Sequence, residues 1–273
     1  MKAISLSVAA GELLAVLGPN GAGKTTAVTL MTGLRRPSGG SARLFGLAPA
    51  DARARARTGV MLQDSGSPGT LRVSETVDLF RSYYPAPLPT ATVLAAARLE
   101  SLARRLVKDL SGGERQRLYF AVAICGDPEA LFLDEPSVGM DPATRRQFWQ
   151  QVRELVGRGR AVVLTTHYLE EADAIADRVA VIDHGLLIAE DTPERIKERV
   201  PGRRISFRAS GPLSDLKGLP VQQAGHGEGR VELLTNDAEA VLRELYRRGV
   251  ATPELEVAGA RLEDAVLALL GGR

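Results

Sequence analysis

The chain has 273 residues, of which 44% are hydrophobic and 25% charged, and its formal net charge is +2 at pH 7. This length suits one full-sized domain with a small appendage, and the small charge argues against a nucleic-acid-binding surface. No run approaches the roughly 18 apolar residues of a membrane span, and the opening MKAISLSVAAGE lacks a signal-peptide pattern. We therefore expect a cytoplasmic chain whose membrane association comes from a partner.

Apolar runs alternate with amphipathic segments along the first two-thirds of the chain. Glu12–Leu17 is predicted to form a buried strand, and a glycine-rich turn leads from it into a helix over Thr25–Thr32. Further strands are predicted at Ala130–Leu133, Ala161–Thr165 and Val179–Ile182. Strands that alternate with helices predict an α/β domain with a mostly parallel sheet.

Two regions depart from this alternation. Residues 73–125 have a helical pattern with a proline-rich loop at Tyr84–Pro89, which predicts a helical insertion. The single cysteine, Cys125, lies in the apolar run AVAIC and is interpreted as a core residue rather than a nucleophile. After a first domain over residues 1–200, we predict a small α+β domain over 201–273. Its predicted elements are strands at Ile205–Ala209, Arg230–Thr235 and Glu254–Val257, helices at Asp237–Arg248 and Leu262–Leu270, and loops over Gly211–Gly229.

A phosphate-binding loop is predicted between the first strand and the first helix. The segment GPNGAGKTT fits the pattern G-x-x-x-x-G-K-[ST] in the right context. Its glycines let backbone N–H groups point at phosphate oxygens, and the helix N-terminus adds the positive end of its dipole. Lys24 supplies a charge for the β- and γ-phosphates, and the Thr25 hydroxyl can ligate Mg²⁺. The predicted nucleotide-binding residues are Gly18, Pro19, Asn20, Gly21, Ala22, Gly23, Lys24, Thr25 and Thr26.

Two adjacent carboxylates follow the strand predicted at Ala130–Leu133. In isolation, Asp134 and Glu135 could be ordinary solvated surface residues. The apolar run before them and Pro136 after them favour a functional role. We expect Asp134 to hold Mg²⁺ through a coordinated water, and Glu135 to orient or deprotonate the attacking water.

A second anion site is predicted at the segment LSGGERQ, residues 110–116. It combines the Ser111 hydroxyl with the backbone N–H groups of Gly112 and Gly113 and a helix expected to start at Glu114. The segment resembles the signature motif of the ABC ATPases. The resemblance implies a P-loop NTPase with the ABC-ATPase fold, which binds and hydrolyses ATP with Mg²⁺. It also implies a homodimer, because in this family the signature of one subunit covers the γ-phosphate of ATP held by the other.

Other segments match the same family. Gln63 resembles the glutamine that reaches Mg²⁺ and the attacking water, at the entry to the helical insertion. Ser137–Asp141 resembles the loop that crosses to the opposite subunit, and His167 resembles the switch histidine that contacts the γ-phosphate. His184 and His226 match no motif, and we interpret them as structural or surface residues.

The resemblance is close over residues 3–195 and points to one branch of the family. Gln63–Tyr84, Asp191–Glu194 and Leu262–Leu270 look like the bacterial drug-exporter ATPases of the daunorubicin-resistance type. Those proteins are single nucleotide-binding domains paired with a separately encoded permease. The implied role is to power export of a small molecule, such as a drug or antibiotic, at the cytoplasmic face of the plasma membrane.

A soluble ABC ATPase acting in translation or DNA maintenance stays open as the alternative. Against it, the chain has one such domain, a short insertion and no cysteine pairs for zinc. An ordinary P-loop kinase is excluded by the signature-like segment.

The sequence departs from the family at the adenine site. ABC ATPases usually stack adenine on an aromatic side chain upstream of the phosphate loop, but none of the 17 residues before Gly18 is aromatic. Either the chain begins late, or other apolar contacts hold adenine. Base stacking is worth about 1–3 kcal/mol, so its absence is expected to weaken ATP binding roughly 10- to 100-fold.

Overall fold

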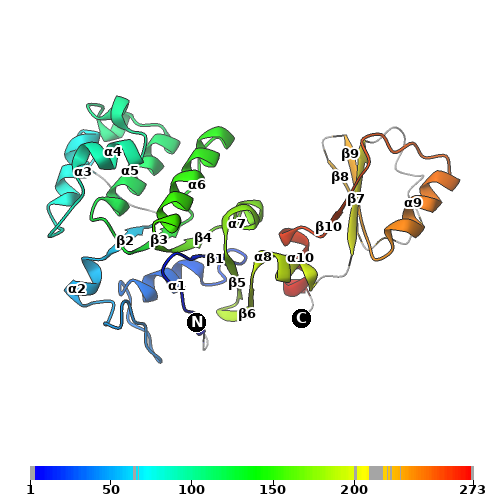
Figure 1. The fold of residues 1–273 in the computed structure, drawn as a ribbon, viewed down its shortest axis with the longest axis horizontal. Coiled ribbons are helices and arrows are strands. Elements are labelled where there is room, and N and C mark those ends of the chain that lie inside the picture. The colour runs from blue at the N-terminus through cyan, green and yellow to red at the C-terminus, as the bar shows by residue number, and fades with distance from the viewer. Residues whose placement is uncertain are drawn as a thin grey trace. The chain divides into compact units, whose positions relative to one another are not determined.

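The computed structural model describes residues 4–63, 66, 68–199, 202–208, 218–219, 221, 223–227 and 229–271. The chain divides into two compact units, Met1–Asp191 and Thr192–Arg273 (Figure 1). This division falls before the boundary expected at residue 200, because helix α8 (Pro193–Glu198) packs on α10 (Leu262–Gly271) of the second unit. Within the described ranges, every helix is too short or too polar to cross a membrane.

The first unit is built on a six-stranded sheet in the order β2-β3-β4-β1-β5-β6. Its strands are β1 (Leu13–Leu17), β2 (Thr58–Met61), β3 (Ala130–Asp134), β4 (Ala161–Thr165), β5 (Arg178–Asp183) and β6 (Leu186–Asp191). All neighbours are parallel except β5 and β6. The four strands predicted in this unit are confirmed to within one residue at either end, as is the predominantly parallel sheet.

Two strands of this sheet, β2 and β6, were not predicted from the sequence. β2 has only four residues and contains Gly59, which weakens a strand signal. The glycine is needed because a Cβ there would lie 2.1 Å from the Ala123 carbonyl oxygen. β6 returns from β5 through a tight turn in which His184 and Gly185 have φ of 44° and 75°. Two such residues form the favoured hairpin turn, and His184 is exposed in it.

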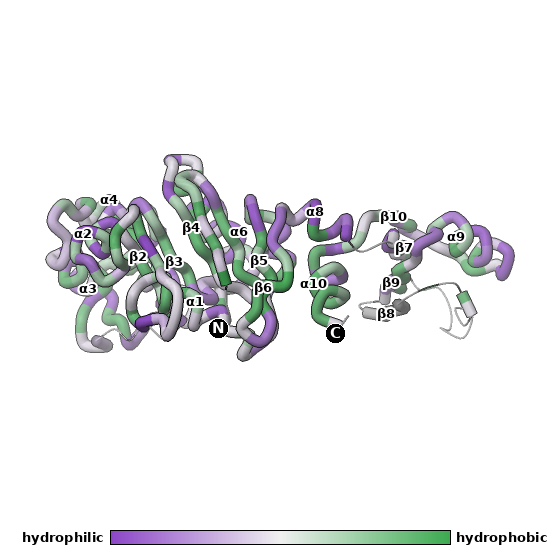
Figure 2. The backbone as a smooth tube through the Cα atoms, turned by 90° about the horizontal axis from the view of Figure 1, so that it is seen from below, coloured by the Kyte–Doolittle hydropathy of each residue, from purple (hydrophilic) through white to green (hydrophobic). Residues whose placement is uncertain are grey.

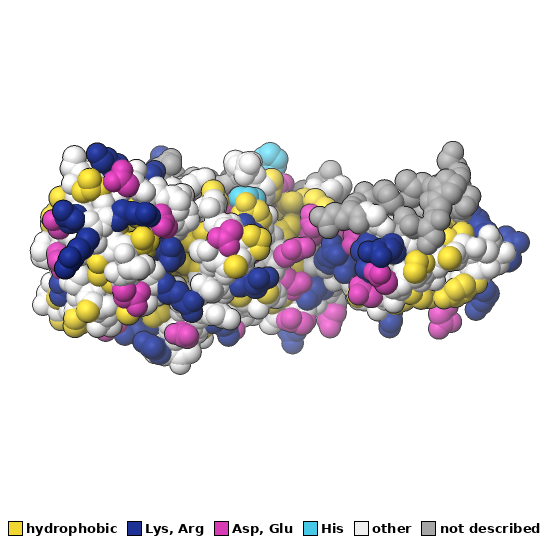
Figure 3. Space-filling model, turned by 90° about the horizontal axis from the view of Figure 1, so that it is seen from above, with side chains coloured by type: hydrophobic (Ala, Val, Ile, Leu, Met, Phe, Trp, Pro, Cys, Tyr) yellow, Lys and Arg dark blue, Asp and Glu magenta, His cyan; other side chains and the backbone are white. Residues whose placement is uncertain are grey.

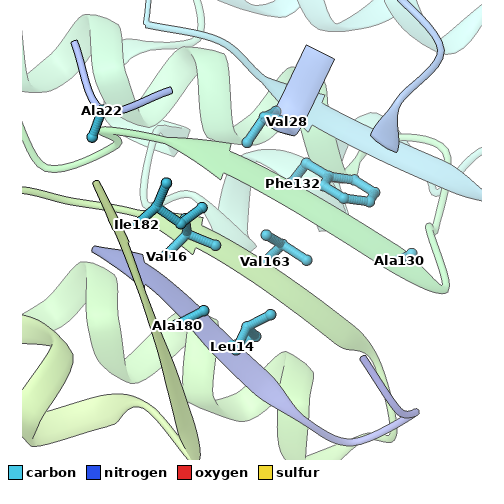
Figure 4. Close-up of a cluster of buried hydrophobic side chains, with 9 residues drawn as sticks. All are labelled: Leu14, Val16, Ala22, Val28, Ala130, Phe132, Val163, Ala180 and Ile182. Carbon is cyan, nitrogen blue, oxygen red and sulfur yellow. The ribbon is translucent and has the colours of Figure 1, made fainter. Parts of the chain in front are cut away.

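One face of the sheet packs against α1 (Lys24–Met31) through a dense apolar cluster (Figure 4). Its members alternate along the strands, as a pleated sheet requires. They are Leu14, Val16, Ala22, Val28, Ala130, Phe132, Val163, Ala180 and Ile182. Hydrophobic residues are concentrated in these central strands (Figure 2). The core thus fixes the strands from which the site loops emerge.

The opposite face is covered by helices, among them α5 (Gly112–Ile124), α6 (Pro142–Gly157) and α7 (Leu169–Ile175) (Figure 1). Edge-to-face packing of Phe120 on Phe148, with ring centroids 5.0 Å apart, joins α5 to α6. The predicted helical insertion is confirmed. It contains α3 (Val73–Arg81), α4 (Thr90–Ala96), two 3₁₀ turns (Glu100–Leu102 and Val107–Asp109) and α5, after the short α2 (Ala52–Arg55). Cys125 is fully buried at the end of α5, as expected.

The second unit is an antiparallel sheet in the order β10-β7-β9-β8, with one helix, α9, packed on it. Besides α8 and α10, which pack on each other, its elements are β7 (Arg203–Arg208), β8 (Gln223–Gly227), β9 (Arg230–Thr235), α9 (Ala238–Arg247) and β10 (Glu256–Gly259). Ile205, Phe207, Leu233, Val241 and Leu245 form its core.

Two expectations for this unit were wrong in detail. The loops expected over 211–229 include a strand, β8, which contains His226. Gly225 and Gly227 weaken the strand pattern of this segment, and the strand forms by pairing with β9. Residues 211–217, 220, 222 and 228 of that expected loop lie outside the described residues, as does Ala209. The last strand starts at Glu256 rather than Glu254, because Glu254 has a φ of 55° and belongs to the preceding turn.

Candidate active site

Neighbouring parallel strands bring the predicted site residues to one edge of the sheet. Thr165, the last residue of β4, is in register with Val16 of β1 on one side and Asp134 of β3 on the other. Gly18 therefore follows β1 at the edge where Glu135 follows β3. Ligands of open α/β sheets bind at this carboxyl edge.

The phosphate loop owes its shape to glycine. A Cβ at Gly18 would lie 2.1 Å from the Ile182 carbonyl oxygen, so no larger residue fits there. Gly21 and Gly23 have φ of 82° and 110°, in the left-handed region that glycine tolerates. The loop is tied to the β5–β6 turn by a 2.9 Å hydrogen bond from the Gly185 N–H to the Ala22 carbonyl. The result is a rigid, curled backbone at the N-terminus of α1.

Lys24 is buried inside this loop, with 7% of its surface exposed. Its ammonium group donates to the carbonyl oxygens of Gly18, at 2.8 Å, and Pro19, at 3.3 Å. It also lies 3.9 Å from Oε1 of Glu135. The positive charge is therefore held between the phosphate loop and the acidic end of β3.

Glu135 is buried and held from two directions. Its backbone has a φ of 51°, which is uncommon for a residue with a side chain, and its N–H donates to the Thr165 carbonyl at 3.1 Å. Its carboxylate oxygen Oε2 accepts the His167 backbone N–H at 3.3 Å and lies 2.6 Å from His167 Nδ1. The His167 side chain is 45% exposed, whereas the Glu135 side chain is 8% exposed.

Asp134 is 1% exposed and uses its two oxygens differently. The Thr165 hydroxyl donates to Oδ1, whereas Oδ2 is buried without a hydrogen-bond partner among the described residues. A buried acceptor without a partner calls for an explanation. A water on Mg²⁺ would satisfy it, and a carboxylate, the exposed Thr25 hydroxyl and phosphate oxygens are the ligand types that Mg²⁺ prefers.

The signature-like segment forms a helix N-terminus with reciprocal capping. Ser111 Oγ accepts the Glu114 N–H at 3.3 Å, and Glu114 Oε2 accepts the Ser111 N–H at 2.8 Å. That second bond is the largest cause of the lowered pKa of Glu114. The helix starts at Gly112 rather than at Glu114 as expected, because Ser111 is the capping residue. Ser111 and Gly112 are exposed.

Comparison with known proteins decides the family. The model of the ABC transporter family matches residues 1–138, half of the chain. This chain is an ABC transporter ATPase. Its fold is that of the family's nucleotide-binding domain, and family membership makes it an ATP hydrolase.

Two curated relatives of this ABC ATPase are ATP-binding proteins, one named for drug resistance and one for export. It is 35% identical to the daunorubicin resistance ATP-binding protein DrrA3 of Streptomyces coeruleorubidus, across 98% of this chain and 90% of the relative. It is 41% identical to the Nod factor export ATP-binding protein I of Burkholderia orbicola, across 71% of this chain and 66% of that protein. A solved ATP-binding subunit of an ABC transporter superposes with a TM-score of 0.65 at 26% identity, covering 71% of this chain and 84% of that one. The predicted resemblance to the drug-exporter branch is confirmed.

The ABC ATPase site includes residues that sequence reasoning missed. Thr165 donates to Asp134 through its hydroxyl, and this hydroxyl also accepts the Glu135 N–H at 3.1 Å. Glu171 of α7 is 7% exposed and accepts from the Ser137 hydroxyl. A hydroxyl that ends an apolar strand is the signal that points to Thr165. Glu171 has no comparable signal, since it is one of two adjacent glutamates.

Gln63 differs from the other catalytic candidates in its contacts. It is exposed in the turn after β2, and among the described residues no hydrogen bond or ion pair joins it to Glu135 or His167. Asp141, at the end of the expected crossing loop, caps α6 by accepting the N–H groups of Ala143 and Thr144. Before β1, the described segment contributes Ile4, Leu6 and Val8 to the core, and the adenine contact stays unassigned.

Proposed function

We propose that this ABC ATPase powers export of a small molecule through a separately encoded permease, working as a homodimer at the cytoplasmic face of the plasma membrane. The observation that carries the ATPase part is the Glu135 carboxylate, which lies between the Lys24 ammonium and the His167 ring. The export part is supported by the relatives named for daunorubicin resistance and Nod factor export.

In the proposed mechanism, the phosphate loop binds the triphosphate of ATP. Lys24 exchanges the carbonyl oxygens of Gly18 and Pro19 for β- and γ-phosphate oxygens, which carry full negative charge. Backbone N–H groups at the start of α1 face the same phosphates. Thr25, Asp134 and Gln63 are the proposed Mg²⁺ residues, and the ion would neutralise charge on the phosphates.

Hydrolysis needs a water aligned with the γ-phosphate. Glu135 is proposed to accept a proton or hydrogen bond from this water through the carboxylate oxygen near Lys24. His167 contacts the other carboxylate oxygen, and its exposed side chain is proposed to contact the γ-phosphate. Gln63 is proposed to complete the water's environment once nucleotide is bound.

The homodimer is proposed because the signature segment is exposed. Within the described part of the chain, no hydrogen bond joins Ser111, Gly112 or Gly113 to the phosphate loop of the same chain. A second copy is the partner whose γ-phosphate they would cover. We propose that closure of this dimer moves the helical insertion, where Leu79 of α3 and Tyr83 in the turn after it are exposed and would contact the permease.

The test is Mg²⁺-dependent ATPase activity of the purified chain as a function of its own concentration. Activity per subunit should rise with concentration and vanish in Glu135→Gln, because each site needs residues from two copies. A constant activity per subunit would contradict the shared site. If no activity appears at any concentration, activity should return on addition of the permease.

Co-purification separates the exporter from the alternative in translation or DNA maintenance. A multi-spanning membrane protein should accompany the chain. Ribosomes or DNA as the main partner would overturn the export proposal. Basic and acidic side chains are interspersed on the face of the first unit seen in Figure 3, in keeping with the expectation of no nucleic-acid partner.

A further inference from the structure

A buried carboxylate next to the active site has no role in the mechanism above. Glu171 is 7% exposed and lies in the first turn of α7. The Ser137 hydroxyl lies 3.0 and 2.9 Å from its two carboxylate oxygens, to which it donates. The Thr166 hydroxyl donates to Oε2 at 3.3 Å, and Arg145 Nε lies 3.1 Å from Oε1. One carboxylate thus joins three segments.

Two of these segments carry the catalytic pair. Ser137 lies two residues after Glu135, and Thr166 lies immediately before His167. The Glu171 carboxylate therefore bridges the continuations of β3 and β4, just beyond the 2.6 Å contact between Glu135 and His167. A shift of either segment would alter that contact.

The third segment, which contains Arg145, contacts the residue that follows His167. Arg145 of α6 stacks over the ring of Tyr168, with 4.6 Å between the guanidinium carbon and the ring centroid. The Tyr168 N–H donates to the Thr166 hydroxyl at 2.9 Å. Both neighbours of His167 in the sequence are thereby held by one connected polar network.

Burying a carboxylate and its partners costs desolvation free energy. Burial raises the pKa of the Glu171 carboxyl, whereas Ser137 and Arg145 oppose that shift. Apolar residues of similar volume often stabilise a fold as well as a buried ion pair does. Fold stability alone therefore does not explain a carboxylate at this position, whereas its bridge between the two catalytic segments does.

We propose that Glu171 is a positioning residue for ATP hydrolysis, which holds Glu135 and His167 in their productive geometry through Ser137 and Thr166. The proposal rests on the catalytic roles proposed for Glu135 and His167. It also makes Glu171 the link between that pair and the segment Ser137–Asp141, which is expected to cross to the second subunit.

Glu171→Gln and Ser137→Ala test the proposal, with Glu170→Gln as the matched control. Glu170 is exposed in the same helical turn, so its variant should keep wild-type activity. The two test variants should lower kcat by about tenfold to a hundredfold, the range for a small misplacement of a catalytic group. The KM for ATP and the calorimetric Kd should stay within about twofold, because the phosphate loop is not touched. The double variant should lose no more than the stronger single one.

Each result decides the matter. Wild-type kcat in both variants would overturn the proposal. A fall in ATP affinity and thermal stability together with kcat would also overturn it, because that pattern indicates a general loss of structure. Independent, multiplicative losses in the double variant would contradict the link through Ser137. Glu135→Gln and His167→Ala are measured in the same assay. If Glu135→Gln and His167→Ala keep wild-type kcat, the catalytic roles proposed for these two residues are wrong. If they lose activity while Glu171→Gln stays fully active, only the positioning role of Glu171 is rejected.

Discussion

Oε2 of Glu135 lies 2.6 Å from Nδ1 of His167, although the two residues are 32 positions apart in the chain. The contact exists because β3 and β4 are adjacent and parallel, with Asp134 opposite Thr165 at their ends. The other carboxylate oxygen of Glu135 lies 3.9 Å from Lys24. One carboxylate thus faces the phosphate-binding cation and the switch-like histidine at once, which makes it the most informative residue to change.

Glu135→Gln should keep ATP binding, lose turnover and accumulate an ATP-bound dimer. The amide retains the shape of the side chain but removes its charge and its basicity. We expect kcat to fall at least about 100-fold, measured by phosphate release, and the dimer to appear by size-exclusion chromatography with ATP. The control is Glu154→Gln, which makes the same change from carboxylate to amide at an exposed position on α6. Near-normal hydrolysis by the Glu135 variant would refute the assigned role.

Lys24→Ala should abolish or strongly weaken nucleotide binding. Hydrogen bonds to charged groups are worth about 1.5–3 kcal/mol, so affinity should fall roughly 10- to 150-fold or more. Isothermal titration calorimetry measures this directly. Unchanged affinity would count against the site, provided that circular dichroism shows the variant folded.

Cys125 should resist alkylation until the protein unfolds. Burial raises the pKa of its thiol from 9.0 to about 11, and the reactive form is the thiolate. The raised pKa means that this group's contribution to stability is complete below pH 9 and is lost as pH rises through 11. Labelling with iodoacetamide at pH 8, with and without denaturant, checks this. Rapid labelling of the native chain would contradict the burial.

Gly59→Ala should destabilise the first unit. The added methyl group would meet the Ala123 carbonyl at 2.1 Å, so α5 must move away from β2. Overpacking of this kind costs about 1–3 kcal/mol, seen as a lower melting temperature. Gly157→Ala is the matched control, because nothing lies within 4 Å of its Cβ position, at the end of α6. An alanine in that helix should be neutral or slightly stabilising. Equal melting temperatures for the two variants would show that α5 can move away from β2 without a loss of stability.

Local patterns predicted much of this fold. β1, β3, β4 and β5 are apolar runs with polar ends, and a buried strand needs no information beyond that run. β2 and β6 were missed because their signals are weak until a neighbour is known. Gly59 looks like a strand breaker until α5 is seen to approach it, and β6 forms because the turn at His184 folds it back on β5.

For the active site, the residues of each loop are enough to indicate its chemistry. The spacing of the glycines before Lys24, the paired carboxylates at the end of β3 and the helix-capping serine at residue 111 are local patterns with local physical reasons. How these groups come together depends on the packing and order of the strands. The strand order places β4 between β1 and β3, so that the Thr165 hydroxyl reaches Asp134 and the Glu135 N–H. Glu171 gains its place in the site from the packing of α7 beside Ser137 and Thr166. Such contacts depend on the pairing of strands that are distant in the chain, which no local pattern encodes.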